Sequence, residues 1–183
     1  MKRFLALLGC LVALAAAAQE RAISSKVVVP ASLDDTWAAW TTTEGIKSFF
    51  APDAKVEARV DGPFEVYMNP YGVPGMKGAD GMRFLAVEPR SMITFTWNAP
   101  PTMPNVRKQR TYVTVRFKST GPKTTEVSLY HGGWGEGAEW DRAFAYFEKA
   151  WTNVLVSLEE RFVKGPYDWS EWLKRMKEMT PAK

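Results

Sequence analysis

The longest regular hydrophobic pattern in this 183-residue chain lies between Gly137 and Val163. Apolar residues recur there every three or four positions, which is the spacing of one continuous stripe on an α-helix. Gly165 followed by Pro166 supplies the usual stop signals. The segment therefore predicts one amphipathic helix roughly 39 Å long, which needs a broad apolar surface to cover. The stripe consists of Trp140, Phe144, Phe147, Trp151, Val154, Leu155, Leu158 and Phe162.

A second pattern, the alternation of apolar and polar residues that is typical of strands, runs through most of the chain before that helix. Residues 21–29 predict a first strand rich in β-branched residues. Two short helices are predicted next, one that Ser32 caps and that contains Trp37 and Trp40, and one at residues 44–50. Six further strands are predicted at residues 55–60, 63–68, 82–88, 92–98, 111–119 and 124–131.

The alternation within these strands predicts a sheet with one buried face and one wet face. Ile93, Phe95 and Trp97 share one side of their strand, for example, while Thr94 and Thr96 take the other. Together the elements predict an α+β fold of the helix-grip type. In it a curled antiparallel sheet of about seven strands wraps around the long C-terminal helix in the order β-α-α-β6-α, with an apolar cavity between them.

The lengths of the connections give the predicted sheet two different ends. Tight turns near Asp61-Gly62 and at residues 88–91 and 120–123 fall at one end. The connections at residues 69–81 and 98–110 fall at the other end and are long and rich in Pro and Gly. Because binding sites usually lie on loops that a rigid scaffold holds, we expect the mouth of the cavity at the end with the long loops.

The first 18 residues have the pattern of a signal peptide. Lys2 and Arg3 precede an apolar stretch that is too short for a stable membrane anchor, and Ala16-Ala17-Ala18 supplies the small residues of a cleavage site. We therefore expect a periplasmic or secreted protein. Its parts would be a signal peptide at 1–18, a domain at 19–165 and a C-terminal extension at 166–183 with a short amphipathic helix.

An alternative interpretation of the leader is a lipoprotein cleavage box at Leu7-Leu8-Gly9-Cys10, which would leave the protein anchored through a lipidated Cys10. Against it, the apolar run of residues 11–18 would then remain on the mature chain.

Charge and side-chain chemistry exclude several classes of function. The formal net charge is +4, and loss of Lys2 and Arg3 leaves 22 basic against 20 acidic residues, a poor electrostatic match for nucleic acid. Cys10 is the only cysteine and His131 the only histidine, so neither a disulfide nor a metal site nor a cofactor is expected. The mature chain also lacks an apolar run long enough for a transmembrane segment.

The C-terminal extension carries its own apolar stripe, formed by Trp169, Trp172, Leu173 and Met176. Two interpretations remain open. The short helix packs on the domain, or it contacts a partner or a membrane surface.

Three stretches resemble the activator of Hsp-ninety ATPase homologue-like family, within the START-like (SRPBCC, birch-pollen-allergen-like) superfamily. They are residues 28–41, residues 87–97 with the Val87-Glu88-Pro89-Arg90 turn, and residues 113–131 followed by the long helix. The resemblance covers nearly the whole mature domain. It implies a helix grip, often with a hydrophobic ligand cavity and with a structural histidine at His131, and it does not imply one activity.

Aromatic and aliphatic side chains on the inward faces near the mouth are the candidates for ligand contact, because small-molecule pockets have apolar walls and few polar groups. His131 is the one polar candidate. The other candidates are Phe50, Phe64, Val66, Met68, Phe95, Trp97, Phe147 and Trp151.

The leading hypothesis for function is an exported protein that binds an apolar small molecule or lipid-like ligand. One alternative is a cyclase-like or hydrolase-like enzyme that uses His131 in the same cavity, although no catalytic partner for this histidine is evident. Another is a protein-interaction module similar to a chaperone activator.

Overall fold

The computed structural model describes residues 20–180. The expected signal peptide and Cys10, with the lipoprotein alternative, lie outside the described residues.

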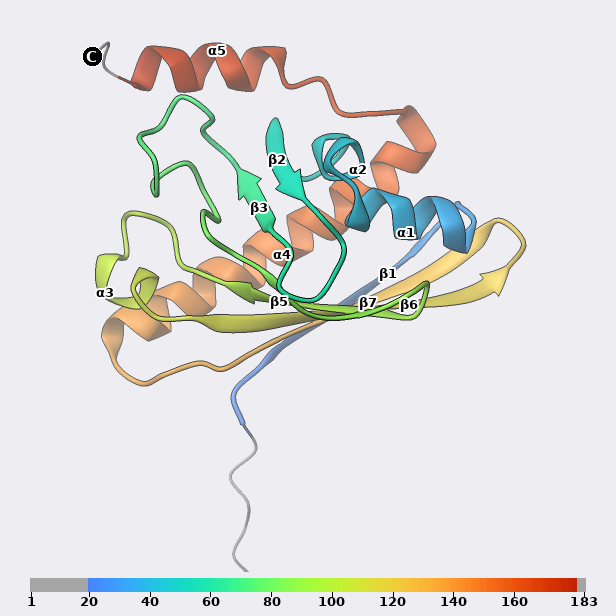
Figure 1. Cartoon of the computed structure of the whole chain (residues 1–183), viewed down its shortest axis with the longest axis horizontal. Helices are drawn as coiled ribbons and strands as arrows, with labels where there is room; N and C mark the ends of the chain where they lie inside the picture. Colours follow the sequence, from blue (N-terminus) through green and yellow to red (C-terminus); the bar gives the residue numbers. More distant parts are fainter. Residues whose placement is uncertain (1–19, 181–183) are drawn as a thin grey trace, which may run out of the picture.

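Five antiparallel strands form the main sheet, in the spatial order β1-β7-β6-β5-β4 (Figure 1). Inward positions alternate with outward ones along each strand, as in Ile93, Phe95 and Trp97, which are all buried. The strands are β1 (Ile23–Val29), β4 (Phe84–Glu88), β5 (Met92–Trp97), β6 (Thr111–Gly121) and β7 (Thr124–Gly132).

The remaining strands, β2 (Asp53–Val56) and β3 (Phe64–Tyr67), pair with each other in a small second sheet. A single bridge, Pro63 to Arg83, connects this sheet with the start of β4. The predicted sheet of about seven strands is therefore divided into five and two. The cause is the path of the long connection after β3: its last residues run beside β3, with a bridge from Gly78 to Tyr67, so β3 and β4 adjoin only where each strand begins.

Helix α4 (Ala138–Lys164) is 27 residues long and lies across the inner face of the main sheet (Figure 1). Its buried side contains most of the predicted stripe, while Phe144, Val154 and Phe162 are half-buried at its margins. The helix ends at Gly165, whose φ of 97° is a conformation that favours glycine. Together with the sheet it confirms the α+β helix-grip fold. The buried residues of α4 are Trp140, Ala143, Phe147, Trp151, Leu155 and Leu158.

Two short helices close the grip beside α4. Helix α1 (Leu33–Thr41) begins at Ser32, whose hydroxyl accepts a hydrogen bond from the Asp35 backbone N–H at 3.1 Å. Helix α2 (Thr43–Lys47) follows at once and leads into Phe49 and Phe50, which both enter the core.

The long loops lie at the left end of the molecule in Figure 1, opposite the β6–β7 turn. The loop of residues 98–110 contains a short helix, α3 (Pro104–Arg107), that the sequence pattern does not predict. Glu139 at the start of α4 accepts hydrogen bonds from the backbone N–H groups of Asn105 and Val106, at 2.9 and 3.1 Å. The loop is therefore attached to the long helix.

The C-terminal extension carries helix α5 (Ser170–Met179), which packs over the small sheet and α2. Two indole N–H groups hold it there, both with N···O distances of 2.6 Å. Trp172 donates to the Met68 carbonyl and Trp169 to the Lys47 carbonyl. Two residues of the apolar stripe of the extension therefore contact the rest of the protein.

Candidate functional site

Most of the side chains expected to contact a ligand lie together in the core between the main sheet and α4. Eight of the nine are buried, and His131 is fully inaccessible to solvent. Met68 is the exception: it is half-buried at the end of β3, beneath α5. The buried eight are Phe50, Phe64, Val66, Phe95, Trp97, His131, Phe147 and Trp151.

These side chains pack directly against one another. The rings of Phe64 and Phe95 are stacked with centroids 4.0 Å apart, and those of Trp97 and Trp151 are 5.3 Å apart. Phe50 lies 5.8 Å from each of these two tryptophans and is the residue that separates them from α2. Strands β3 and β5, the turn after α2 and helix α4 thus contribute to one aromatic cluster, and its side chains fill the interior in this structure.

His131 is held at both ring nitrogens. The indole N–H of Trp151 donates to Nδ1 at 2.9 Å, and Nε2 lies 2.8 Å from the Thr111 hydroxyl. Because an indole can only donate, Nδ1 must accept, and Nε2 therefore carries the proton and donates to Thr111. The Thr111 hydroxyl in turn donates to the Trp97 carbonyl at 3.3 Å.

This environment favours the neutral form of His131. Burial lowers the pKa of the imidazole from 6.5 to about 3. A general base needs a free nitrogen close to its substrate, and both nitrogens of His131 are bonded to protein. The arrangement is that of a structural histidine that links β7 to α4, as the family resemblance implies.

Two buried indole N–H groups in the same cluster have no hydrogen-bond partner among the described residues. They belong to Trp97 on β5 and Trp40 on α1. Phe50 lies between them, with its ring centroid 5.8 Å from Trp97 and 6.0 Å from Trp40. An unpaired buried donor is unfavourable, so these positions require a physical explanation.

Arg107 is a buried residue at the end with the long loops that the sequence pattern does not predict. Its guanidinium donates to the carbonyls of Ala99, Gly75 and Gly78 at 2.6, 2.6 and 2.8 Å, and it forms an ion pair with Asp80 at 3.3 Å. Burial lowers the pKa of Arg107, an effect that the Asp80 carboxylate partly offsets. The side chain clamps the two long loops together. No sequence signal marks it, because the loops that it joins have no periodic pattern.

Thr111 and Trp134 are further contacts of His131 that the sequence pattern does not predict. Trp134 donates its indole N–H to the His131 carbonyl at 2.8 Å, and its ring packs on the imidazole. The strand register would have found Thr111, which is the β6 partner of Trp97 and adjoins the strand of His131.

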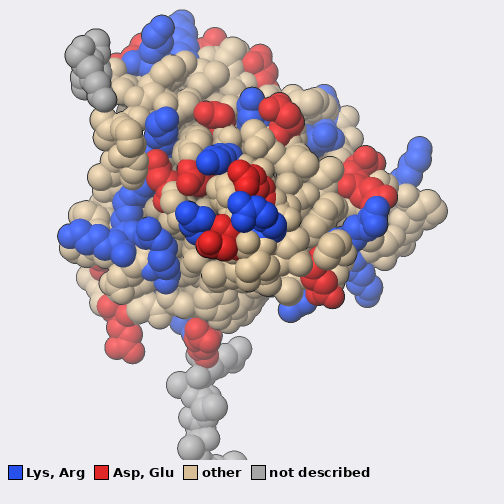
Figure 2. Space-filling model, in the orientation of Figure 1, with Lys and Arg blue, Asp and Glu red and all other residues tan. Residues whose placement is uncertain are grey.

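Metal-ligating clusters, membrane-spanning helices and charged surfaces are the remaining features of the described residues that bear on function. Within residues 20–180, no cluster of metal-ligating side chains is present and no helix is long and apolar enough to cross a membrane. Positive and negative side chains are interspersed over the face seen in Figure 2, unlike the uniformly basic surface typical of nucleic-acid binding.

A curled sheet closed around one long helix, with an aromatic interior and a buried structural histidine, defines a helix-grip protein of the START-like class. The model of the family described as activator of Hsp90 ATPase homolog 1-like protein matches residues 30–162, and the chain belongs to this family. No curated protein matches the chain.

Solved structures share this fold at low sequence identity. Protein MLL2253 from Mesorhizobium loti is 20% identical with a TM-score of 0.64, over 80% of this chain and 100% of that one. The Aha1 dimer from Colwellia psychrerythraea is 19% identical with a TM-score of 0.61, over 79% and 98%. CalU16 from Micromonospora echinospora is 20% identical with a TM-score of 0.58, over 88% and 84%. At such identities the likeness concerns the fold.

Proposed function

We propose that this is an exported protein that binds an apolar small molecule in the grip between the main sheet and α4. The observation that carries the proposal is the buried, unpaired indole N–H of Trp97 within an aromatic cluster. Small-molecule sites combine apolar walls with a few polar groups that orient the ligand, and the Trp97 N–H is such a group.

The chemistry of this position indicates what kind of ligand fits. The indole N–H only donates, so the ligand must offer an acceptor such as a carbonyl or ether oxygen. The surroundings of Trp97 are aromatic rings, so the remainder of the ligand should be apolar. Pairing the N–H with a ligand oxygen would remove the penalty of an unsatisfied buried donor, which favours the bound state.

Binding requires that the interior opens, because Phe50 and its neighbours fill it. Phe50 is the side chain best placed to move, since it lies in the short turn after α2 rather than in a strand or the long helix. The Arg107 clamp would open at the same time and separate the two loops at the mouth. Ligand access by loop opening is common in proteins whose sites lie beneath long loops.

Export is part of the proposal and rests on the signal-peptide pattern of residues 1–18. Intact mass and N-terminal sequencing of the protein from its own compartment test it. A mature chain that starts near Gln19 supports secretion or a periplasmic location, and a lipidated Cys10 supports the lipoprotein alternative. An uncleaved N-terminus would contradict both.

Ligand binding can be tested with two probes that differ by one acceptor atom. 2-Undecanone and undecane have chains of the same length, and only the ketone can accept from Trp97. We expect native mass spectrometry and NMR titration to give about tenfold tighter binding of the ketone, a difference of the size of one buried hydrogen bond. In Trp97→Phe this preference should disappear.

Trp37→Phe is the matched control. Trp37 packs against Phe117 at the opposite end of the grip, with centroids 5.4 Å apart, so the preference for the ketone should remain. If the wild-type protein binds neither probe, and protein purified from its own compartment has the mass of the bare polypeptide, the proposed function is wrong.

A further inference from the structure

The outer face of the main sheet is not covered by any helix among the described residues. Helices α1, α2 and α4 lie on its inner face, and α5 lies beyond the small sheet (Figure 1). On the outer face there is a shallow hollow of about 430 Å³ over strands β1, β7 and β6. Its location is separate from the aromatic interior, so it can be considered independently of the proposed function.

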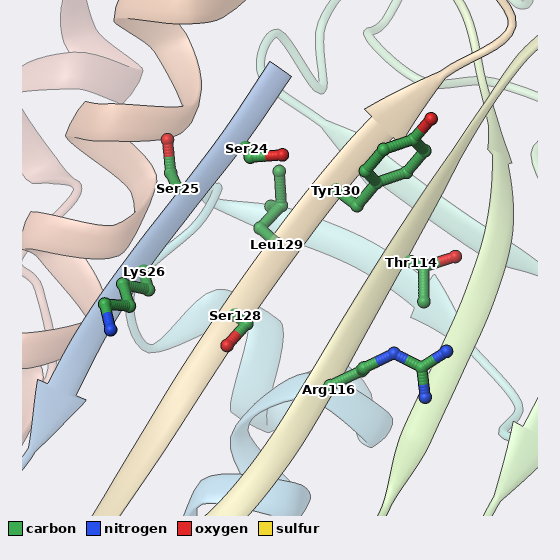
Figure 3. A pocket seen from close by; sticks show the side chains of 8 residues that line it. All are labelled: Ser24, Ser25, Lys26, Thr114, Arg116, Ser128, Leu129 and Tyr130. Carbon is green, nitrogen blue, oxygen red and sulfur yellow. The ribbon is translucent and has the colours of Figure 1, made fainter. Parts of the chain in front are cut away.

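The strand register aligns two cationic side chains on either side of this hollow. Lys26 on β1 is opposite Ser128 on β7, and Ser128 is opposite Arg116 on β6, so the three form one row across the sheet. Figure 3 shows Ser128 between Lys26 and Arg116. Adjacent strands are about 4.8 Å apart, so the two backbones lie roughly 10 Å from each other and both long side chains can reach an anion above Ser128.

The next row supplies hydroxyl groups. Ser24, Tyr130 and Thr114 are cross-strand neighbours on the same face. The Tyr130 ring forms a wall of the hollow (Figure 3). It packs beside Tyr112 with ring centroids 6.1 Å apart, which holds it in place. Small side chains at Ser24, Thr114 and Ser128 are what leave the hollow open.

The charges at the hollow are of one sign. Lys26 and Arg116 are its only charged lining residues among those described, and no carboxylate lines it. Arg116 takes part in none of the ion pairs found within residues 20–180. Lys26 has an exposed pair with Glu126 at 3.5 Å, and such a pair is weak enough to yield to a stronger anion.

We propose that this hollow binds a phosphate-type oxyanion carried by a small ligand. Arg116 and Lys26 contact the oxyanion from two sides, and the hydroxyls of Ser128 and Ser24 donate to its remaining oxygens. The Tyr130 ring contacts the carbon skeleton to which the group is attached. Guanidinium, ammonium and hydroxyl donors around one point are the groups that bind phosphate oxygens most strongly.

The test is an NMR titration of the ¹⁵N-labelled protein with inorganic phosphate at constant ionic strength. We expect saturable shifts in the amides of residues 24–26, 114–116 and 128–130. The double variant Lys26→Gln/Arg116→Gln should weaken binding at least about tenfold, because a charge-assisted hydrogen bond changes a Kd by that order. Ser128→Asp, which places a carboxylate between the cations, should weaken it similarly.

Lys118→Gln is the control for the loss of positive charge, since it removes one cation from β6 in the next outward position, outside the hollow. Its Kd should stay within about twofold of the wild-type value. All these side chains except the half-buried Ser128 are exposed, so the variants should keep the dispersed spectrum of the folded protein. Shifts that do not saturate, or that are the same in the double variant, would overturn the proposal.

Vesicles of phosphatidylcholine that contain phosphatidic acid distinguish two sources of the phosphate group. Sedimentation of the wild-type protein with these vesicles, lost in the double variant, would identify a lipid headgroup as the source. Phosphate binding without sedimentation would identify a free phosphate ester.

Discussion

Trp151 donates its indole N–H to Nδ1 of His131 across 2.9 Å, and this bond joins the long helix to the last strand of the sheet. A protonated imidazole has no lone pair at Nδ1, so the bond exists only while His131 is neutral. The attachment of α4 to β7 is therefore coupled to the protonation state of one buried side chain.

The stability of the protein should depend on pH through His131. Its pKa is about 3 in the folded protein and 6.5 in the unfolded chain, so between these values the unfolded chain takes up a proton that the folded protein excludes. The stabilising contribution is complete above about pH 6.5 and is lost as the pH falls toward 3. We expect a slope of up to about 1.4 kcal/mol per pH unit from this group in urea unfolding.

His131→Gln separates this effect from the titration of carboxylates, because glutamine does not titrate. The variant should be less stable at pH 7, and its stability should fall less steeply between pH 6 and 4. If the unfolding free energies of the two proteins change in parallel with pH, His131 is not the cause of the pH dependence.

Arg107→Met should release the two long loops from each other. Three carbonyls lose their donor and Asp80 loses its cation, so we expect the free energy of unfolding to fall by about 2–4 kcal/mol. Hydrogen exchange should become faster in residues 72–80 and 98–106, with little change in β6 and β7.

Arg110→Met is the control for that experiment. Arg110 is exposed and, within residues 20–180, donates only to the carbonyls of Arg107 and Gln109, so its loss should change the unfolding free energy by less than about 0.5 kcal/mol. Equal effects of the two substitutions would mean that Arg107 is not a clamp.

The attachment of α5 should depend on its two indole N–H groups. Trp169→Phe together with Trp172→Phe keeps most of the apolar contact and removes both hydrogen bonds, so the amides of α5 should exchange about tenfold faster or more. The exchange of β7 should not change, because α5 opens without the sheet. Lys174→Ala, on the exposed side of the same helix, should not change the exchange of the α5 amides. If the α5 amides of the double variant exchange at the wild-type rate, the indole N–H groups do not hold the helix.

The regular elements were predictable because their patterns are local. The stripe from Trp140 to Phe162 determined the position of α4 to within one residue, and alternation identified all the strands. The division of the sheet could not be foreseen, because it depends on the path of residues 69–81, which have no periodicity. Helix α3 was missed for a similar reason: four residues are too few for a hydrophobic repeat.

The interior residues were predictable from strand parity, which places Phe95, Trp97 and His131 on the inner face. Their contacts were not, since the partner of each indole N–H depends on the distances between strands and helix. Strand parity placed Trp97 in the interior and the helical stripe placed Trp151 there, yet the Trp151 N–H is bonded to His131 and the Trp97 N–H is unpaired among the described residues. Arg107 was missed because a lone arginine in a loop is normally exposed.

The close approach of Trp97 and Trp151 also has an optical consequence. Their ring centroids are 5.3 Å apart with the planes inclined at 47°, so the intense far-ultraviolet transitions of the two indoles should couple and produce a paired positive and negative circular dichroism band. A molecule that enters between the rings would move them apart and reduce that coupling. The protein thus contains its own chromophore pair at the centre of the grip, and entry of the proposed ligand could be followed without a dye or a label.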